Sequence, residues 1–322
     1  MICDVHAHCL PEGVDKFLVE RYKVNAMKRP VFVPFDSPVS DSIADVDRRV
    51  EMMDEAGVQV QILSLVNLPL LNNETDTVAV VRLANDAHAR VARRHPDRFK
   101  VYAELPLPYL DASLKELNRC REELGIEAVN ILASHGTVSA VAEEFDPLFE
   151  ELDRTGSIVF FHPRVSGLCS QLLTDYQLNA PLGPALEDTV LVFQMLTRQF
   201  PLRFPHLEII IPHLGGLLPI YMERMDNQMG RMLADLPETP SSMVKRLWFD
   251  TLTHCSAVAL RSACESLGVD RLVTGSDFPA MEHFQGYKAS LDYIRHAGLV
   301  DEDVHQILHV NAPTLFGISQ RC

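Results

Sequence analysis

Eight short apolar segments, each followed by a helical or long irregular stretch, constrain the fold of this chain most strongly. They are rich in β-branched and aliphatic residues, which is typical of parallel strands that are buried on both faces. Strands that alternate with helices favour a parallel sheet, and eight of them favour a single (β/α)8 TIM barrel of the α/β class. The expected strands are 1–8, 58–66, 99–105, 128–132, 157–161, 207–211, 247–249 and 272–275.

Most segments between the strands have helical apolar spacing. Residues 45–56, for example, carry Val46, Val50 and Met53 and stop at Gly57, a residue type that commonly ends helices. The exception is segment 10–42, with four prolines, where we expect a long loop insertion that covers the strand ends. An ordinary surface loop that does not cover the strand ends would have the same composition. The expected helices are 45–56, 75–95, 110–124, 145–154, 188–200, 218–233 and 257–267.

The length of 322 residues and the hydrophobic content of 47% would suit one barrel or two smaller domains. We find no composition shift, flexible linker or internal repeat that divides the chain. The sequence therefore predicts one domain over residues 1–322.

Charge and cysteine content exclude several classes of partner. The formal net charge of -15 argues against a general nucleic-acid or anionic-membrane surface, because such surfaces need basic patches. No apolar run reaches membrane-spanning length. The seven cysteines are scattered without CxxC pairs, which suits free thiols in a reducing cytoplasm. We therefore expect a cytoplasmic protein that binds neither nucleic acid nor membrane.

Histidine and aspartate residues follow several of the expected strands. In a parallel barrel the reactive groups gather at the carboxyl ends of the strands, so we expect these side chains to share one mouth. His6 and His8 are one strand period apart and point to the same face. The five residues are His6 and His8 after the first strand, His162 after the fifth, His213 after the sixth and Asp277 after the eighth.

Imidazole and carboxylate groups are the residue types that bind a divalent metal, and a catalytic metal site also leaves one coordination position open. Such a metal can lower the pKa of a bound water, or it can hold a substrate carboxylate and an adjacent oxygen. Both modes stay open at this point.

Four motifs carry a family resemblance that spans essentially the whole chain. They are His6-x-His8, Phe161-His162-Pro163, Pro212-His213-Leu214-Gly215-Gly216 and Gly275-Ser276-Asp277-Phe278-Pro279. In this order they resemble the amidohydrolase superfamily, and within it the branch that holds aminocarboxymuconate semialdehyde decarboxylase and γ-resorcylate decarboxylase.

The resemblance implies one divalent metal, zinc in most such enzymes and manganese in some, held by His6, His8, His162 and Asp277. It also implies a homodimer and a catalytic or metal-adjacent role for His213. A lysine that would bridge two metals is absent from the end of the fourth strand, so a single metal is favoured. We expect Asp277 or His213 to deliver or relay a proton.

Three further residues are candidates for substrate binding. Arg164 follows His162 closely and could pair with a carboxylate, or it could form a structural salt bridge. Arg224 matches a position where the resembled decarboxylases place an arginine across a dimer interface; its alternative partner is Asp226. His135 follows the fourth strand and is either at the mouth or merely exposed.

Asp250, at the end of the seventh strand, could orient a ligand histidine. The muconate-type decarboxylases carry an arginine in their first long loop. That arginine has no clear counterpart here, because Arg21 and Arg29 stand at other spacings. A phenolic acid with one carboxylate is therefore relatively favoured. The apolar residues Met27, Phe32 and Phe35 suit an aromatic ring, or plain packing.

The sequence thus predicts a metal-dependent decarboxylase, a carbon–carbon lyase that acts on a small aromatic or unsaturated carboxylic acid. The first alternative is a hydrolase or hydratase of a lactone, amide or double bond on the same site, because a fold alone does not choose between these reactions. A non-catalytic binding protein is a third reading, against which the complete set of ligand residue types argues.

Overall fold

The structure is a computed structural model that describes residues 1–24, 37–65, 71, 73–233 and 236–318. Eight parallel strands form one sheet in the order β1-β2-β3-β4-β7-β8-β9-β10, as the sequence predicts. Backbone hydrogen bonds from Val5 to Thr274 and from His8 to Phe278 join the first strand to the last and close the barrel. The strands are β1 Ile2–His8, β2 Val58–Ser64, β3 Phe99–Glu104, β4 Ala128–Leu132, β7 Ile158–His162, β8 Glu208–Ile211, β9 Trp248–Asp250 and β10 Leu272–Val273.

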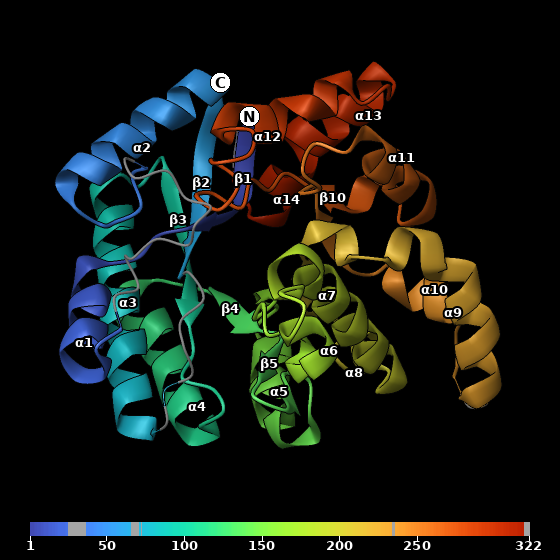
Figure 1. Ribbon diagram of the computed structural model, residues 1–322, viewed down its shortest axis with the longest axis horizontal. Coiled ribbons are helices and arrows are strands. Elements are labelled where there is room, and N and C mark those ends of the chain that lie inside the picture. The colour runs from blue at the N-terminus through green and yellow to red at the C-terminus, as the bar shows by residue number, and fades with distance from the viewer. Residues whose placement is uncertain (25–36, 66–70, 72, 234–235, 319–322) are drawn as a thin grey trace.

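Helices surround this sheet (Figure 1), with α1 to α4 beside β1 to β3 and α9 to α11 on the opposite side. A short hairpin, β5 Ser134–His135 and β6 Val138–Ser139, follows β4. The helices are α1 Glu12–Tyr22, α2 Ile43–Ala56, α3 Glu74–Arg94, α4 Leu110–Arg119, α5 Asp146–Arg154, α6 Gln171–Thr174, α7 Asn179–Thr197, α8 Phe200–Arg203, α9 Leu218–Met232, α10 Pro240–Val244, α11 Ala257–Ser266, α12 Tyr287–Asp292, α13 Asp301–His305 and α14 Ala312–Leu315. In the described part of the chain, no helix is long and apolar enough to span a membrane.

Alternate strand residues divide the core into an inner and an outer layer. Inside the barrel, Tyr102 stacks on Phe160 with ring centroids 5.2 Å apart. Between the strands and the helices lies a larger apolar cluster, to which Val101 and Phe161 belong. Because strand side chains alternate, the residues two positions beyond Tyr102 and Phe160 also face the barrel interior. Those residues are Glu104 and His162.

The expectation of a wholly irregular segment at 10–42 is wrong, because the segment contains helix α1. Val14 and Leu18 are buried one helical turn apart and pack with Val80 and Ala84 of α3. Pro11 stands just before the helix, where a proline does not interrupt helical hydrogen bonding. Residues 25–36, including Met27, Phe32 and Phe35, lie outside the described residues.

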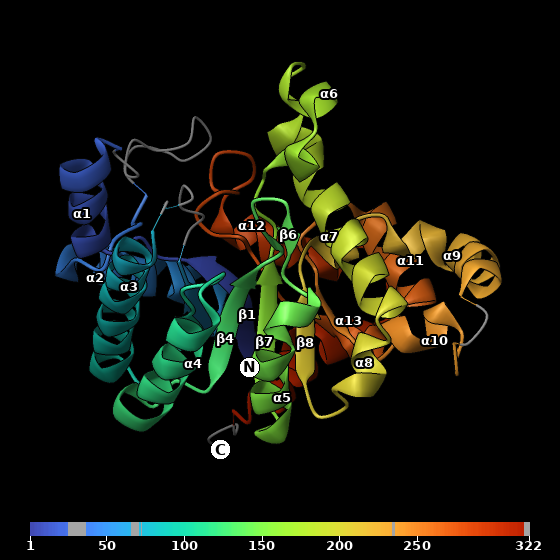
Figure 2. The same cartoon turned by 90° about the horizontal axis from the view of Figure 1, so that it is seen from below.

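Helix α7 begins earlier than the expected residue 188. It starts at Asn179 and continues through Pro184, a residue that normally ends or kinks a helix. Together with α6 it projects from the barrel on the side of the strand ends (Figure 2). Its buried face includes Glu187 and Asp188, both of which contact the mouth of the barrel.

Candidate metal centre

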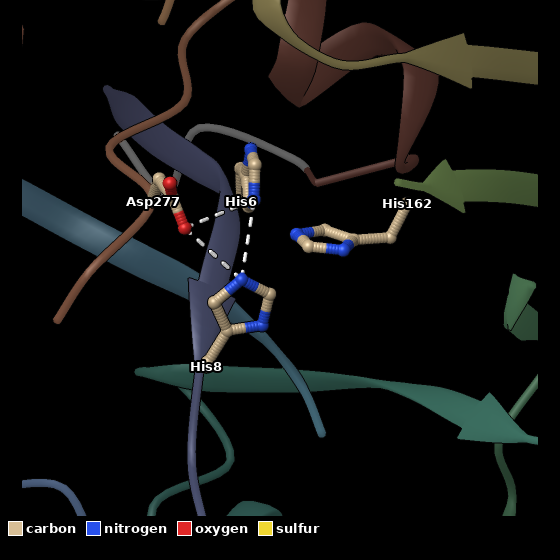
Figure 3. Close-up of side chains that lie close together, drawn as sticks. All are labelled: His6, His8, His162 and Asp277. Atoms are coloured by element: carbon tan, nitrogen blue, oxygen red, sulfur yellow. Dashed lines mark hydrogen bonds and ion pairs between the residues drawn. The ribbon is translucent and has the colours of Figure 1, made fainter. Parts of the chain in front are cut away.

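Four side chains from three separate elements converge at the carboxyl ends of the strands. His6 and His8 project from β1, His162 ends β7 and Asp277 follows β10 (Figure 3). One ligand atom from each residue can be chosen so that all four lie within 4.8 Å of one another. The structure thus brings together the four residues that the sequence suggested as metal ligands.

The distances among these atoms are close to those of a metal-binding group. The Nε2 atoms of His6 and His8 are 3.3 Å apart. Asp277 Oδ1 lies 3.1 Å from His8 Nε2 and 3.4 Å from His6 Nε2. Ligand atoms about 2.1 Å from a tetrahedral zinc ion are separated by about 3.4 Å.

Each of the three histidines is oriented through its other ring nitrogen. His6 Nδ1–H donates to Asp250 Oδ2 at 2.6 Å, and His162 Nδ1–H donates to the Pro163 carbonyl at 2.8 Å. His8 Nδ1 lies 2.9 Å from Ser64 Oγ, whose hydroxyl is 3.2 Å from the Ala7 carbonyl. With the protons on Nδ1, the Nε2 lone pairs face the centre of the group, as metal ligation requires.

One atom of the group supports metal binding in particular. His162 Nε2 is buried and has no hydrogen-bond partner among the described residues. An unpaired buried nitrogen is costly unless something occupies its lone pair. The residues present therefore fit a divalent cation.

Electrostatics favour the metal-binding protonation states of His162, His8 and Asp277. Burial, followed by the nearby imidazoles, holds the pKa of His162 well below its usual value, and burial also lowers the pKa of His8. Burial would raise the pKa of Asp277, but its interactions with His6, His213 and His8 outweigh this and hold it well below its usual value. Neutral imidazoles and an ionised carboxylate are the forms that bind metals.

Glycine 275 permits the close approach of two strands beneath the site. A Cβ atom at this position would lie 2.9 Å from the Asp250 Cβ and 3.0 Å from the His6 Cβ. A larger residue would push apart the carboxylate and the imidazole that it orients. Asp250 itself is fully buried, as the proposed role of orienting a ligand histidine requires.

His213 lies beside the four residues and contacts a carboxylate of its own. Its Nδ1 is 2.8 Å from Asp188 Oδ2, and its Nε2 is 3.9 Å from Asp277 Oδ2. Its backbone N–H donates to Asp250 Oδ1 at 2.8 Å. Burial opposes the charging of His213, but Asp188 and Asp277 outweigh it and raise the pKa of His213 well above its usual value. The arrangement favours a protonated imidazole at the mouth.

The three candidates for substrate binding lie in different places. His135 and Arg164 line a cavity of about 90 Å³ at the strand ends, together with Glu104 and Asn130. Arg224 is exposed on α9, away from the group of four. Its alternative partner Asp226 instead accepts hydrogen bonds from the backbone and the hydroxyl of Ser241.

Sequence reasoning missed three side chains of this region. Asp188 marked only the start of an expected helix, Ser64 lay inside an expected strand, and Glu104 was one polar residue near a strand end. Strand alternation could have suggested Glu104, since it shares the parity of the interior residue Tyr102. No comparable signal pointed to Asp188, because its role depends on where α7 packs.

The family model described as amidohydrolase matches residues 3–318. The chain belongs to the amidohydrolase family. It is 25% identical over 297 residues to the 2-amino-3-carboxymuconate-6-semialdehyde decarboxylase of Dictyostelium discoideum, covering 86% of this chain and 81% of that protein. It is 28% identical over 319 residues to the γ-resorcylate decarboxylase of Rhizobium radiobacter, covering 90% of this chain and 93% of that protein. These two relatives of this amidohydrolase are enzymes that release carbon dioxide.

Two further comparisons bear on the reaction and on the fold. A 2-keto-4-carboxy-3-hexenedioate hydratase of Sphingobium is 24% identical over 345 residues, covering 98% of this chain and 96% of that protein. The structure of a dihydroxybenzoic acid decarboxylase from Polaromonas, with bound manganese and the inhibitor 2-nitroresorcinol, superposes with a TM-score of 0.78. The two chains are 23% identical, and 99% of this one and 98% of that one are covered.

Proposed function

We propose that this amidohydrolase is a metal-dependent, non-oxidative decarboxylase of a small aromatic or unsaturated carboxylic acid. The observation that carries the proposal is the convergence of His6, His8, His162 and Asp277 at the mouth, with His213 beside them. The decarboxylase relatives support the reaction type.

These residues would hold one divalent ion. When bound, that ion supplies positive charge that orients the substrate carboxylate with its neighbouring oxygen and stabilises developing negative charge. Asp250, Ser64 and the Pro163 carbonyl keep the three imidazole rings in place through Nδ1. This support limits the motion of the ligands during the reaction.

Decarboxylation breaks the bond between the carboxyl carbon and the substrate, and the electron pair left on the substrate carbon must receive a proton. His213 is placed to supply it, because its protonated Nε2 faces the site while Nδ1–H donates to Asp188. Asp188 stabilises the positively charged ring before transfer and fixes its orientation. Asp277 Oδ2 lies 3.9 Å from His213 Nε2, an ion-pair distance that exceeds hydrogen-bond length, so a proton relay through Asp277 requires the two side chains to move closer.

The first experiment measures carbon dioxide release from hydroxybenzoates and muconate-like acids by the metal-loaded protein. We expect release that stops on chelation and returns with zinc or manganese. His213→Gln should lower kcat by about 100-fold to 10,000-fold while the metal content stays at that of the wild type. His162→Ala should lose both metal and activity, and unchanged activity in this variant would refute the ligand assignment.

The hydratase relative favours a second candidate, the addition of water to a double bond at the same site. The two reactions are separated by their products. Oxygen-18 from labelled water that appears in the product without gas release would establish a reaction with water, either hydration or hydrolysis, and would overturn decarboxylation.

We further propose zinc as the physiological metal, a homodimer with Arg224 at its interface, a cytoplasmic location and one domain over residues 1–322. Three imidazole nitrogens and a single carboxylate oxygen are ligands typical of zinc, and exposed Arg224 on α9 is accessible to a second subunit. Elemental analysis tests the metal, and light scattering of wild type and Arg224→Ala tests the dimer. Cell fractionation tests the location, and limited proteolysis tests the single domain.

A further inference from the structure

A second group of polar side chains lies at the mouth of the barrel, outside the candidate metal centre. Glu104, Asn130, His135 and Arg164 line the cavity of about 90 Å³ together with leucines such as Leu65 and Leu107. The inference drawn from this cavity rests on the proposed decarboxylase function.

The cavity lies next to the metal centre, on the side of β2, β3 and β4. Glu104 and His162 both face the barrel interior, and Leu132 pairs with His162 across β4 and β7. Leu65 directly follows Ser64, which contacts His8. A substrate held at the four ligand residues is therefore bordered by this cavity.

Arg164 supplies positive charge to the cavity. Its guanidinium is half-buried, and its backbone N–H donates to Glu187 Oε2 at 2.6 Å. The Glu187 carboxylate attracts Arg164, but it also accepts hydrogen bonds from the backbone and the hydroxyl of Ser166. The Arg164 guanidinium itself forms no hydrogen bond or ion pair with another described residue, so its N–H donors are open to a ligand.

Two buried atoms at the cavity have no hydrogen-bond partner among the described residues. They are His135 Nε2 and Asn130 Oδ1. Burial, followed by the charge on Arg164, lowers the pKa of His135 to about 4, so the imidazole is neutral near pH 7. A neutral imidazole can donate one hydrogen bond to a ligand carboxylate, whereas the Asn130 amide oxygen only accepts and therefore calls for water or a ligand hydroxyl.

The carboxyl group of Glu104 does not oppose an anion in this cavity. It accepts hydrogen bonds from the Leu65 backbone at 2.6 Å and from Asn130 Nδ2 at 2.9 Å and 3.1 Å. These donors are uncharged, and burial raises the pKa of Glu104 to about 8. Burial thus favours the neutral form of the Glu104 carboxyl group, and Arg164 supplies positive charge to the cavity.

The size of the cavity decides which part of a ligand it holds. A volume of about 90 Å³ corresponds to roughly three water molecules at about 30 Å³ each. That space suits one carboxylate with its attached carbon and is too small for a substituted aromatic ring. The ring must then lie between the cavity and the metal centre.

We propose that this cavity is a subsite for a second carboxylate of the substrate, bound by Arg164 and His135, so that dicarboxylic acids are preferred. The first carboxylate then faces the metal centre. This differs from the sequence expectation of a phenolic acid with one carboxylate, which followed from the missing arginine in the first long loop. Arg164 provides the missing charge from a different strand end.

Calorimetric titration of the metal-loaded protein with benzoate and with isophthalate tests the subsite, since the two acids differ by one carboxylate. Wild type should bind isophthalate about 10-fold to 100-fold more tightly, the gain typical of a hydrogen-bonded charge pair. In Arg164→Met the two affinities should agree within about 3-fold. Arg164→Lys should give an intermediate preference, because it keeps the charge without the planar fork.

Two further variants complete the test. His135→Phe keeps an aromatic ring beside Phe145 and should reduce the preference for isophthalate by several-fold without reducing benzoate affinity; an unchanged preference removes His135 from the subsite. Arg90→Met is the matched control, because Arg90 lies on the outer face of α3. If Arg164→Met does not fold, the lysine and His135 variants decide.

The outcomes separate this inference from the proposed reaction. If no acid releases carbon dioxide but isophthalate is preferred through Arg164, the subsite stands and the decarboxylase proposal falls. If carbon dioxide is released but wild type binds both acids equally, the subsite is refuted. An equal loss of both affinities in Arg164→Met also refutes it, because Arg164 would then bind the carboxylate that faces the metal centre.

Discussion

A single buried carboxylate connects the two halves of the candidate site. Asp250 Oδ2 accepts the Nδ1 proton of His6, and Oδ1 accepts the backbone N–H groups of His213 and Leu252. One residue therefore orients a proposed metal ligand and the turn that carries the proposed proton donor. A substitution of Asp250 should therefore affect both the His6 ring and the turn that carries His213.

We expect Asp250→Asn to lower zinc affinity by about 10-fold to 100-fold. Asparagine has one acceptor oxygen, so its amide N–H would face either the His6 Nδ1–H or a backbone N–H, and both are donors. Competition with a chelator measures the affinity. Asp226→Asn on α9, which contacts Ser241, is the control, and equal affinities in the two variants would contradict the prediction.

The raised pKa of Glu104 predicts that the free energy of unfolding depends on pH. Its pKa is raised from 4.5 to about 8 by burial, so the folded state binds the proton more tightly than the unfolded state. The stability from this group is full below pH 4.5 and is lost as the pH rises towards 8. Between pH 5 and 8.5 the free energy of unfolding of wild type should fall by roughly 4 kcal/mol relative to Glu104→Gln.

Urea unfolding of the two metal-loaded proteins across this range measures the difference. The curves of stability against pH should converge at acidic pH and separate at alkaline pH. Parallel curves would show that Glu104 titrates alike in the folded and unfolded states.

The residues of the site were predictable where strand position alone determines their direction. His6, His8, His162 and Asp277 stand at expected strand ends, and one architecture brings all strand ends together. Asp188 gains its role from tertiary packing, because a lone acidic residue in a helix carries no such information in the sequence. For Glu104, strand alternation indicates the barrel interior, but its hydrogen-bond partners depend on tertiary packing.

At the level of elements, the turn after β8 is the most unusual piece of backbone near the site. His213, Leu214, Gly215 and Gly216 all have positive φ angles, between 54° and 70°. A Cβ atom at Gly216 would lie 2.0 Å from the Ala185 carbonyl oxygen of α7. The turn thus packs directly on the helix that supplies Asp188.

Gly216→Ala should destabilise the protein by about 3 kcal/mol or more and lower activity, because both the positive φ and the contact with α7 oppose a side chain. Gly57→Ala is the matched control: its φ is 72° and the space around it is open. That control should cost about 1 kcal/mol. Thermal unfolding measures both changes, and equal losses would show that the α7 contact has no effect.

Elements with regular apolar spacing were predictable, and those between prolines were not. The strands follow from apolar runs, and α2 from Val46 and Met53. Helix α1 was missed because prolines surround its two buried positions, Val14 and Leu18. Its apolar face is recognisable only against α3, so tertiary contacts decide its conformation.

For the whole molecule, the metal centre spans the closure of the barrel. His6 and His8 come from β1, Asp277 follows β10 beside it, and His162 reaches in from β7. A bound ion would link these three parts of the barrel, and binding restricted to the folded state stabilises it.

Removal of the metal by a chelator should lower the melting temperature by on the order of 5 °C, and zinc should restore it. Differential scanning calorimetry, with elemental analysis of the same samples, measures the effect. His162→Ala should show no response to chelator or zinc. A wild-type melting temperature that is unchanged after confirmed metal loss would contradict a link between the three parts.

His8 and Asp277, 3.1 Å apart in the folded protein, are separated by 269 positions in the chain. At a translation rate of about 5 to 20 residues per second, a ribosome needs on the order of tens of seconds to make the intervening segment. Throughout that interval the histidine pair of β1 lacks both its carboxylate partner and the neighbouring strand β10. The four proposed ligands are therefore complete only late in biosynthesis, and a nascent chain that stalls before β10 lacks the full candidate metal centre.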